Sequence, residues 1–251
     1  MISTSIERAF DMSGRVLLVT GAAAGIGLAT ATLFAEQGAR AVLLDRAPAV
    51  VDVAGTLPGS GHVGVVCDVT DPAAVDAAVA SVESRIDVLV NSAGIVRLAP
   101  ADALTAQDWN ATIDINLTAS FTVAQSVGRR MLAQGGGRIV NLASQAAVVA
   151  LDQHVAYCAS KAAIVAMTKV LALEWGPSGI TVNCISPTVV ETELGRLAWA
   201  GEVGDAMRAR IPTRRFARPD EIATAALYLA SGAAGMINGE NLVVDGGFTI
   251  Q

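Results

Sequence analysis

A phenol and an ammonium group stand four residues apart in HVAYCASKAAIV, the segment that covers residues 154–165. On an α-helix this spacing places Tyr157 and Lys161 on one face, with Cβ atoms about 6 Å apart. Taken alone, the two residues are more simply explained as a hydrogen-bonded pair than as a catalytic site. A catalytic site needs a third group. Ser144 is a candidate because it ends the apolar segment GRIVNLAS, where α/β sheets present residues to a ligand.

The pKa of Tyr157 decides whether its phenol can act as a base. A free phenol has a pKa of about 10, so a base at neutral pH requires a decrease of about 3, equivalent to about 4 kcal/mol. One positive charge about 4 Å away supplies energy of this order at an effective dielectric constant of about 20. We therefore expect Lys161 to lower the pKa of Tyr157 enough for proton transfer.

A glycine-rich turn, VTGAAAGIGLA at residues 19–29, follows the first apolar run of the chain. Gly21 permits a tight turn, Gly25 lets the backbone approach a phosphate, and Gly27 allows close packing of helix and strand. The spacing is G-x-x-x-G-x-G, so the motif alone does not establish a dinucleotide site. Its position between the first strand and the first helix favours one, with the pyrophosphate at the start of the helix.

The type of dinucleotide depends on Asp45, which ends the second apolar run, 18 residues after Gly27. A carboxylate at this point can accept hydrogen bonds from the ribose hydroxyls of adenosine, and it would repel a 2′-phosphate. Arg46, the next residue, could instead face a phosphate. On the strength of Asp45 we expect NAD to be preferred over NADP.

Short apolar runs alternate with helical segments along the chain, which implies one parallel sheet covered by helices on both faces. No internal repeat or linker-like stretch interrupts the pattern, so we expect one α/β domain over residues 1–251. The segment 191–220, called the lid segment below, breaks the alternation and is interpreted as a lid over a pocket. Strands are expected at 15–20, 40–45, 63–68, 87–94, 137–144, 180–187 and 240–247, and helices at 25–38, 71–84, 108–133, 154–175 and 219–231.

The composition argues against several classes of protein. With 53% hydrophobic and 16% charged residues, the chain is too apolar to be disordered. Its net charge is −6 and it has no long run of Lys and Arg, so nucleic acid is not an expected partner. Three cysteines and two histidines show no zinc-ligand spacing. Residues 1–15 lack a signal-peptide core and no later run is seen to span a bilayer, so we expect a cytoplasmic protein without a membrane partner.

The motifs TGAAAGIG, NSAG, INLTA, Ser144 and YCASK occur in an order and spacing that resemble those of the short-chain dehydrogenase/reductase family. The resemblance extends from about residue 14 to residue 251 and implies a Rossmann-type, doubly wound sheet. It also implies a catalytic tetrad of Asn116, Ser144, Tyr157 and Lys161. In this tetrad Ser144 would hold the substrate oxygen, and Asn116, in a long helix, would link Lys161 to solvent through a water. The cofactor contacts implied are Gly21, Gly25, Ile26, Gly27, Asp45, Arg46, Asp68, Val69, Asn91, Ala93, Gly94, Tyr157, Lys161, Pro187, Val190 and Thr192.

One position departs from the family pattern. The family usually has Pro-Gly where this chain has Pro187 followed by Thr188. Because a β-branched residue is strained at positive φ, we expect the backbone and the pocket wall at Thr188 to differ from the common pattern.

The substrate is expected to meet residues after Ser144, before Tyr157 and in the lid segment. Gln145, Asp152 and His154 are polar in apolar surroundings, and each alone is more simply explained as an exposed or locally bonded side chain. Together they would suit a substrate with several hydroxyl groups, and we assign substrate contacts to Ser144, Gln145, His154 and Tyr157. Two segments, ASQAAVVALDQHVAYCASKAAIV and ISPTVVETELGRLAWAGEVG, also resemble polyol dehydrogenases of this family, of the D-threitol and D-arabitol types.

Other functions remain open at this point. They are an NADPH-dependent 3-oxoacyl thioester reductase, a dinucleotide-sensing protein without turnover, and an enzyme for an apolar sterol or quinone beneath Leu194, Leu197 and Trp199. The resemblance further implies a homotetramer that pairs the helices near 108–133 and 154–175. In some relatives a structural Mg²⁺ is bound by the C-terminal carboxylate, which is that of Gln251 here.

Overall fold

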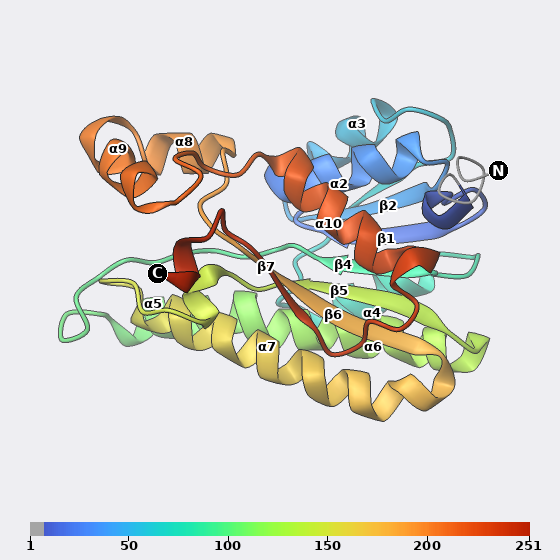
Figure 1. Ribbon diagram of the computed structural model, residues 1–251. Helices are drawn as coiled ribbons and strands as arrows, with labels where there is room; N and C mark the ends of the chain where they lie inside the picture. Colours follow the sequence, from blue (N-terminus) through green and yellow to red (C-terminus); the bar gives the residue numbers. More distant parts are fainter. Residues whose placement is uncertain (1–7) are drawn as a thin grey trace.

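A parallel sheet forms the centre of the molecule (Figure 1), and the computed structural model describes residues 8–251 without the side chains of Leu194, Leu197 and Ala198. The strands are β1 (Val16–Thr20), β2 (Arg40–Asp45), β3 (Val63–Val66), β4 (Val88–Asn91), β5 (Gly137–Leu142), β6 (Ile180–Pro187) and β7 (Asn241–Val244). Their order in the sheet is β3-β2-β1-β4-β5-β6-β7, so the direction of winding reverses between β1 and β4. Ligands of such sheets bind at the reversal, beyond the carboxyl ends of the strands.

Helices cover both faces of this sheet. They are α2 (Gly25–Glu36), α3 (Val50–Gly55), α4 (Pro72–Ala80), α5 (Ala106–Ile113), α6 (Ala119–Gln134), α7 (Val155–Trp175), α8 (Glu193–Ala198), α9 (Gly201–Arg210) and α10 (Pro219–Ala230). In Figure 1, α2, α3 and α10 lie over one face, and α4, α6 and α7 over the other. Neighbouring residues of β1 accordingly face different cores: Leu17 packs with α2 and α10, whereas Leu18 packs with α4 and α6. The predicted doubly wound α/β fold is confirmed.

The strands and the principal helices lie where the sequence predicts them, and most differences are at their ends. For example, α4 ends at Ala80 instead of residue 84. The short helix α3 was not predicted, because six residues are too few to show a helical period. The helix expected over 108–133 is interrupted by a π-helical segment, Asp114–Thr118, and the lid segment contains α8 and α9.

Helix α7 is the longest apolar element. The stretch Val155–Ser178 is long and apolar enough to cross a membrane by length and composition alone, a test that the core helix of a protein without a membrane also passes. Its inner side chains, such as Ile164 and Leu171, pack against the sheet. On its outer side Val170 and Leu173 are exposed. The helix is therefore a covering layer of the α/β fold with an apolar outer surface.

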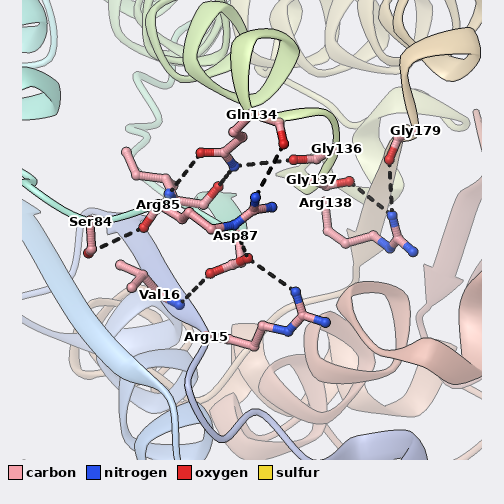
Figure 2. Close-up of polar contacts among 11 residues, drawn as sticks. Arg15, Val16, Ser84, Arg85, Asp87, Gln134, Gly136, Gly137, Arg138 and Gly179 are labelled. Atoms are coloured by element: carbon pink, nitrogen blue, oxygen red, sulfur yellow. Dashed lines mark hydrogen bonds and ion pairs between the residues drawn. The ribbon is translucent and has the colours of Figure 1, made fainter.

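The amino-terminal edge of the sheet is held by the carboxylate of Asp87 (Figure 2). Oδ2 of Asp87 accepts a hydrogen bond from the backbone N–H of Val16 at 3.0 Å. Oδ1 accepts from the guanidinium groups of Arg15 at 3.1 Å and Arg85 at 3.3 Å. The side chain of Asp87 is only 6% exposed, so these three partners satisfy a carboxylate that water scarcely reaches. The contacts tie the start of β1 to the segment that leads into β4.

We expect Asp87→Ala to lower the free energy of unfolding by about 2–4 kcal/mol, because it leaves a buried N–H group and two guanidinium groups without their acceptor. Asp205→Ala is the matched control: it removes an exposed ion pair with Arg208 and should change that free energy by less than about 1 kcal/mol. Urea unfolding followed by circular dichroism measures both variants. Equal effects of the two substitutions would contradict the role given to Asp87.

Candidate active site

A cavity of about 510 Å³ opens at the carboxyl ends of β1, β2 and β4. Its size is within the range of small-molecule and cofactor sites. Its walls come from the glycine turn (residues 21–27), the end of β2 and the segments that follow β3 and β4. Most of the predicted cofactor residues line it: Gly21, Gly25, Ile26, Gly27, Asp45, Arg46, Asp68, Val69, Ala93, Gly94 and Thr192.

The glycine turn keeps the floor of this cavity free of side chains. Gly21 and Gly25 adopt left-handed backbone conformations, with φ of +64° and +59°, that favour glycine. A Cβ atom on Gly27 would stand 2.3 Å from the carbonyl oxygen of Gly21, so the turn can close only around glycine. Helix α2 begins without a side-chain N-cap, which leaves its first N–H groups available to a pyrophosphate. These features fit a dinucleotide.

Asp45 joins the end of β2 to the glycine turn. Oδ2 accepts a hydrogen bond from the backbone N–H of Ala23 at 3.0 Å, and Oδ1 accepts from that of Ala47 at 2.9 Å. A carboxylate has about four acceptor positions, so both oxygens keep acceptor capacity toward the cavity. The residue expected to bind the ribose therefore also shapes the turn beside it.

Two further charged residues stand at the cavity. Asp68 accepts from the hydroxyl of Thr70 at 2.7 Å and from its backbone N–H at 2.9 Å. These hydrogen bonds, helped by the guanidinium of Arg46, hold the pKa of the Asp68 carboxyl below its usual value. The cavity wall thus carries an ionised carboxylate and an exposed guanidinium close together.

Lys161 lies beyond the cavity with its ammonium group buried. Nζ donates to the carbonyl oxygen of Leu142, the last residue of β5, at 2.7 Å. It stands 5.7 Å from the centroid of the Tyr157 ring. Burial lowers the pKa of Lys161 from its ordinary value of 10.5 to about 8. At neutral pH the side chain remains a cation, but one that is unusually ready to lose its proton.

The phenol of Tyr157 does not have the lowered pKa that the sequence analysis expected. Loss of surrounding water raises the pKa of Tyr157, and a hydrogen bond with the Ser144 hydroxyl opposes this only in part. The physical reason is that burial disfavours the phenolate, while the Lys161 ammonium stands over the ring face. Ser144 itself is fixed by the backbone N–H of Ala146, which donates to its Oγ at 3.2 Å.

Asn116 lies in the π-helical segment between α5 and α6, and its side chain is fully buried. Oδ1 accepts from the backbone N–H of Ile95 at 2.8 Å, and Nδ2 donates to the Ile95 carbonyl at 2.9 Å and to Oγ of Ser160 at 3.1 Å. A Cβ atom on Gly94 would stand 3.2 Å from Oδ1 of Asn116 and 3.6 Å from Nζ of Lys161. Asn116 therefore lies beside Lys161, and the expected link to solvent stays a prediction.

Five predicted cofactor residues do not line the cavity: Tyr157 and Lys161, described above, and Asn91, Pro187 and Val190. Asn91 is buried, and its Nδ2 donates to the carbonyl of Ser120 at 3.1 Å and to Oδ1 of Asn141 at 3.0 Å. The side chain of Asn91 thus joins β4 to its neighbours, and its expected contact with the cofactor stays a prediction. Pro187 is buried at the end of β6, and Val190 packs in the core beside α10.

The predicted substrate residues lie around Tyr157. The ring of His154 meets the Tyr157 ring edge to face, with centroids 6.1 Å apart, while its Nδ1 contacts the carbonyl of Asp152. Gln145 follows Ser144 and is only 2% exposed. Its Oε1 is buried and has no hydrogen-bond partner among the residues that the structure describes. An unpaired buried amide oxygen at this place is available to a polar ligand.

The backbone at Thr188 is not strained. Among residues 8–251, the non-glycine residues with positive φ are Gln153 and Arg214, so Thr188 lies outside the left-handed region. The expected difference from the common backbone of the family stays a prediction. The backbone N–H of Thr188 donates to the carbonyl of Val244 at 3.1 Å, which continues the pairing of β6 with β7. The chain passes position 188 in a conformation that a β-branched residue tolerates.

The lid segment contacts the glycine turn at its beginning and packs on itself further along. The hydroxyl of Thr192 accepts from the N–H of Gly195 at 3.0 Å and so caps α8. Its methyl group would lie 3.2 Å from a Cβ atom on Gly25, in the glycine turn. Trp199 packs edge to face on Phe216, at 6.2 Å between centroids. The segment is therefore ordered by contacts at its beginning and near its end.

Seven residues that line the cavity were not named from the sequence: Ala24, Cys67, Thr70, Ser92, Ile95, Ile115 and Glu193. Each is the immediate neighbour of a named residue, so adjacency was the available signal. The C-terminal carboxylate, expected to bind Mg²⁺ in some relatives, belongs to the exposed Gln251, whose amide donates to the Arg210 carbonyl. Within residues 8–251 no group of three or more His, Cys, Asp or Glu side chains is arranged as a metal site.

Comparison with known proteins agrees with this geometry. A family model described as enoyl-(acyl carrier protein) reductase matches residues 21–249. A D-threitol dehydrogenase from Mycolicibacterium smegmatis is 57% identical, over 98% of this chain and 97% of the relative. An NAD-dependent glycerol dehydrogenase from Listeria innocua is 51% identical over the whole of both chains.

A solved structure of a gluconate 5-dehydrogenase from Burkholderia cenocepacia, in complex with NADP and tartrate, superposes with a TM-score of 0.93. It is 38% identical and the match covers 98% of this chain and 99% of that one. The similarity thus includes the glycine turn, the Ser144–Tyr157–Lys161 group and the lid segment. The chain belongs to the short-chain dehydrogenase/reductase family of oxidoreductases.

Proposed function

We propose that the protein oxidises a small polyol, such as D-threitol or D-arabitol, to the ketose, with NAD⁺ as the cofactor. The observation that carries this proposal is the buried Lys161, bonded to the carbonyl of Leu142 and 5.7 Å from the Tyr157 ring centroid, where β5 ends and Ser144 follows. Names of relatives support the substrate class, since one is a D-threitol dehydrogenase and another a glycerol dehydrogenase.

The protein groups divide the work of proton transfer. The phenolic oxygen of Tyr157 accepts the proton of the substrate hydroxyl, and the Ser144 hydroxyl holds the substrate oxygen. The ammonium of Lys161, 5.7 Å from the centroid of the Tyr157 ring, contributes a positive charge that favours the phenolate, but in the protein alone burial outweighs it and the pKa of Tyr157 stays raised. The nicotinamide cofactor, when bound, supplies the hydride acceptor and a positive charge that favours the same phenolate.

A polyol also suits the polar groups around the pair. Gln145 has a buried amide oxygen without a partner, and His154 packs on the Tyr157 ring. An alkyl chain would leave such groups unpaired at a cost of about 1–3 kcal/mol each, which a hydroxylated substrate avoids. This supports the polyol over a 3-oxoacyl thioester or an apolar substrate.

We also propose one domain over the whole chain and a homotetramer. The exposed apolar residues Val170 and Leu173 on α7, with Phe121 and Leu132 on α6, support pairing of these helices between subunits. Apolar groups on an outer helix face are favoured to be covered by a second copy.

The substrate proposal is tested by kcat/KM with NAD⁺ for D-threitol, D-arabitol and 2-butanol, beside acetoacetyl thioesters with NADPH. We expect the polyols to be the best substrates. Tyr157→Phe should lower the polyol rate by about 10²–10⁴-fold, because the phenol is the base, whereas Tyr228→Phe should leave it unchanged. Thioester reduction faster by tenfold or more would overturn the polyol assignment and leave the dehydrogenase chemistry standing.

Cofactor preference depends on Asp45. We expect NAD⁺ to be preferred over NADP⁺, and Asp45→Asn to narrow the ratio of kcat/KM for the two cofactors, because the repulsion of a 2′-phosphate is lost. Asparagine keeps an acceptor for the N–H of Ala23, so the glycine turn should survive. Asp68→Asn is the control, since it removes another carboxylate from the cavity wall. Equal kcat/KM values for NAD⁺ and NADP⁺ in the unmodified enzyme would contradict this assignment.

Burial of the Lys161 ammonium should lower the free energy of unfolding of the protein without cofactor. The pKa of Lys161 is about 8 in the folded protein and has its ordinary value of 10.5 in the unfolded chain. The loss of stability is therefore fully present below pH 8, where the lysine is charged in both states, and it disappears as the pH rises toward 10.5. We expect Lys161→Met to abolish turnover yet raise the free energy of unfolding at pH 7 by about 1 kcal/mol or more. Lys169→Met, on the same helix, should do neither. A stability gain that is unchanged at pH 10.5 would contradict the explanation.

A further inference from the structure

We infer that Thr188 determines substrate specificity: its hydroxyl forms a hydrogen bond with a hydroxyl group of the polyol other than the one that is oxidised. The inference rests on the proposed function and names a residue of the same site. Thr188 stands where the family usually has the Gly of Pro-Gly, and its backbone does not adopt a positive φ.

Thr188 lies at the carboxyl end of the sheet, next to the substrate side of the site. It directly follows Pro187, the last residue of β6, and its N–H bonds the carbonyl of Val244. In the pairing of β5 with β6, Leu142 is level with Ile185, and the N–H of Ala143 donates to the Ile185 carbonyl at 2.8 Å. Beyond this pair the chain after β5 turns into the 3-10 helix Gln145–Ala147, which packs against β6, so Thr188 and Gln145 both lie just past the ends of neighbouring strands.

The side chain of Thr188 belongs to the row of β6 that faces α7. Cys184 packs with Ile164 of α7, and both Cys184 and Ser186 donate to Oδ1 of Asn241, so these two residues share a face. Side chains alternate along a strand, and the next member of this row is Thr188. It therefore projects on the sheet face from which α7 presents Tyr157 and Lys161.

The hydroxyl of Thr188 is buried without a partner. The residue is 7% exposed, and Oγ1 has no hydrogen-bond partner in the described part of the chain. An unpaired buried hydroxyl is unfavourable, and native proteins keep such a group where something else satisfies it. Gln145, in the 3-10 turn that follows β5, has an unpaired amide oxygen as well. A ligand with at least two hydroxyl groups would satisfy both, whereas glycine at position 188 would offer no side-chain hydroxyl.

The same strand supplies a matched control. Thr181, at the opposite end of β6, is 9% exposed and also has a buried hydroxyl without a partner among the described residues. It lies at the amino-terminal edge of the sheet, away from the tetrad. Thr181→Val and Thr188→Val therefore each remove a buried hydroxyl without a partner, and only Thr188 lies at the carboxyl end of the sheet, where the tetrad is.

The experiment measures kcat and KM with NAD⁺ for D-threitol and for 2-butanol, which has a single hydroxyl. We expect Thr188→Val to lower kcat/KM for D-threitol by about 10-fold or more, chiefly through KM, and to change that for 2-butanol less than about 2-fold. Thr188→Ser should keep most of the D-threitol activity, and Thr181→Val should match the unmodified protein. NADH binding, followed by fluorescence, verifies that each variant is folded.

Two results would overturn the inference: a Thr188→Val variant that matches the unmodified protein on D-threitol, or one that loses equal activity on both alcohols. These differ from failure of the proposed function. In that case the unmodified protein itself would prefer 2-butanol or would not oxidise D-threitol, before any variant is considered.

Discussion

The burial of the Lys161 ammonium group is the constraint on which the rest of the site depends. A charge out of reach of water is unfavourable unless it is hydrogen-bonded, and the carbonyl of Leu142 accepts from it at 2.7 Å. That carbonyl is available because β5 ends at Leu142, where the strand ladder stops. Gly94 lies beside the ammonium, and a Cβ atom there would press on Oδ1 of Asn116 at 3.2 Å, so the glycine leaves room for the amide that lies next to Lys161. The strand end and the helix that carries the lysine must be in register for one charge to be tolerated.

Two buried amide side chains maintain this register. Asn141 of β5 accepts from Asn91 of β4 and donates to the hydroxyl of Thr168 on α7, so a single residue joins two strands and a helix. Asn116 joins the π-helical segment to the backbone after β4 and to Ser160 of α7. In each case the partners fix the orientation of the amide. Because α7 is held at both points, the phenol and the ammonium keep their positions relative to the strand ends.

The parts of the site that depend on backbone geometry could be predicted from the sequence, and those that depend on packing could not. Gly27 and the four-residue spacing of Tyr157 and Lys161 have direct geometric meaning, so the cavity floor and the proximity of these two side chains were anticipated, whereas the tetrad as a set came from the resemblance to the family. The pKa of Tyr157 depends on how much water is lost, which no spacing reports. Asn91 was assigned to the cofactor because it belongs to the NSAG motif, but its side-chain amide points into the interior and donates to Asn141. The backbone at Thr188 follows from the pairing of β6 with β7, which a comparison of residue types does not reveal.

The π-helical segment between α5 and α6 has a consequence for how these helices are built. A π turn accommodates one residue more than an α turn, and each residue rotates an α-helix by about 100°. Two helices that continue each other along the chain therefore present different registers on either side of Asp114–Thr118. The residues of α6 that pack on the sheet therefore need not follow the same helical spacing as the residues that α5 presents earlier in the chain. A single-residue insertion, which would disturb the packing of an ordinary helix, here separates the sequence requirements of the core from those of the site.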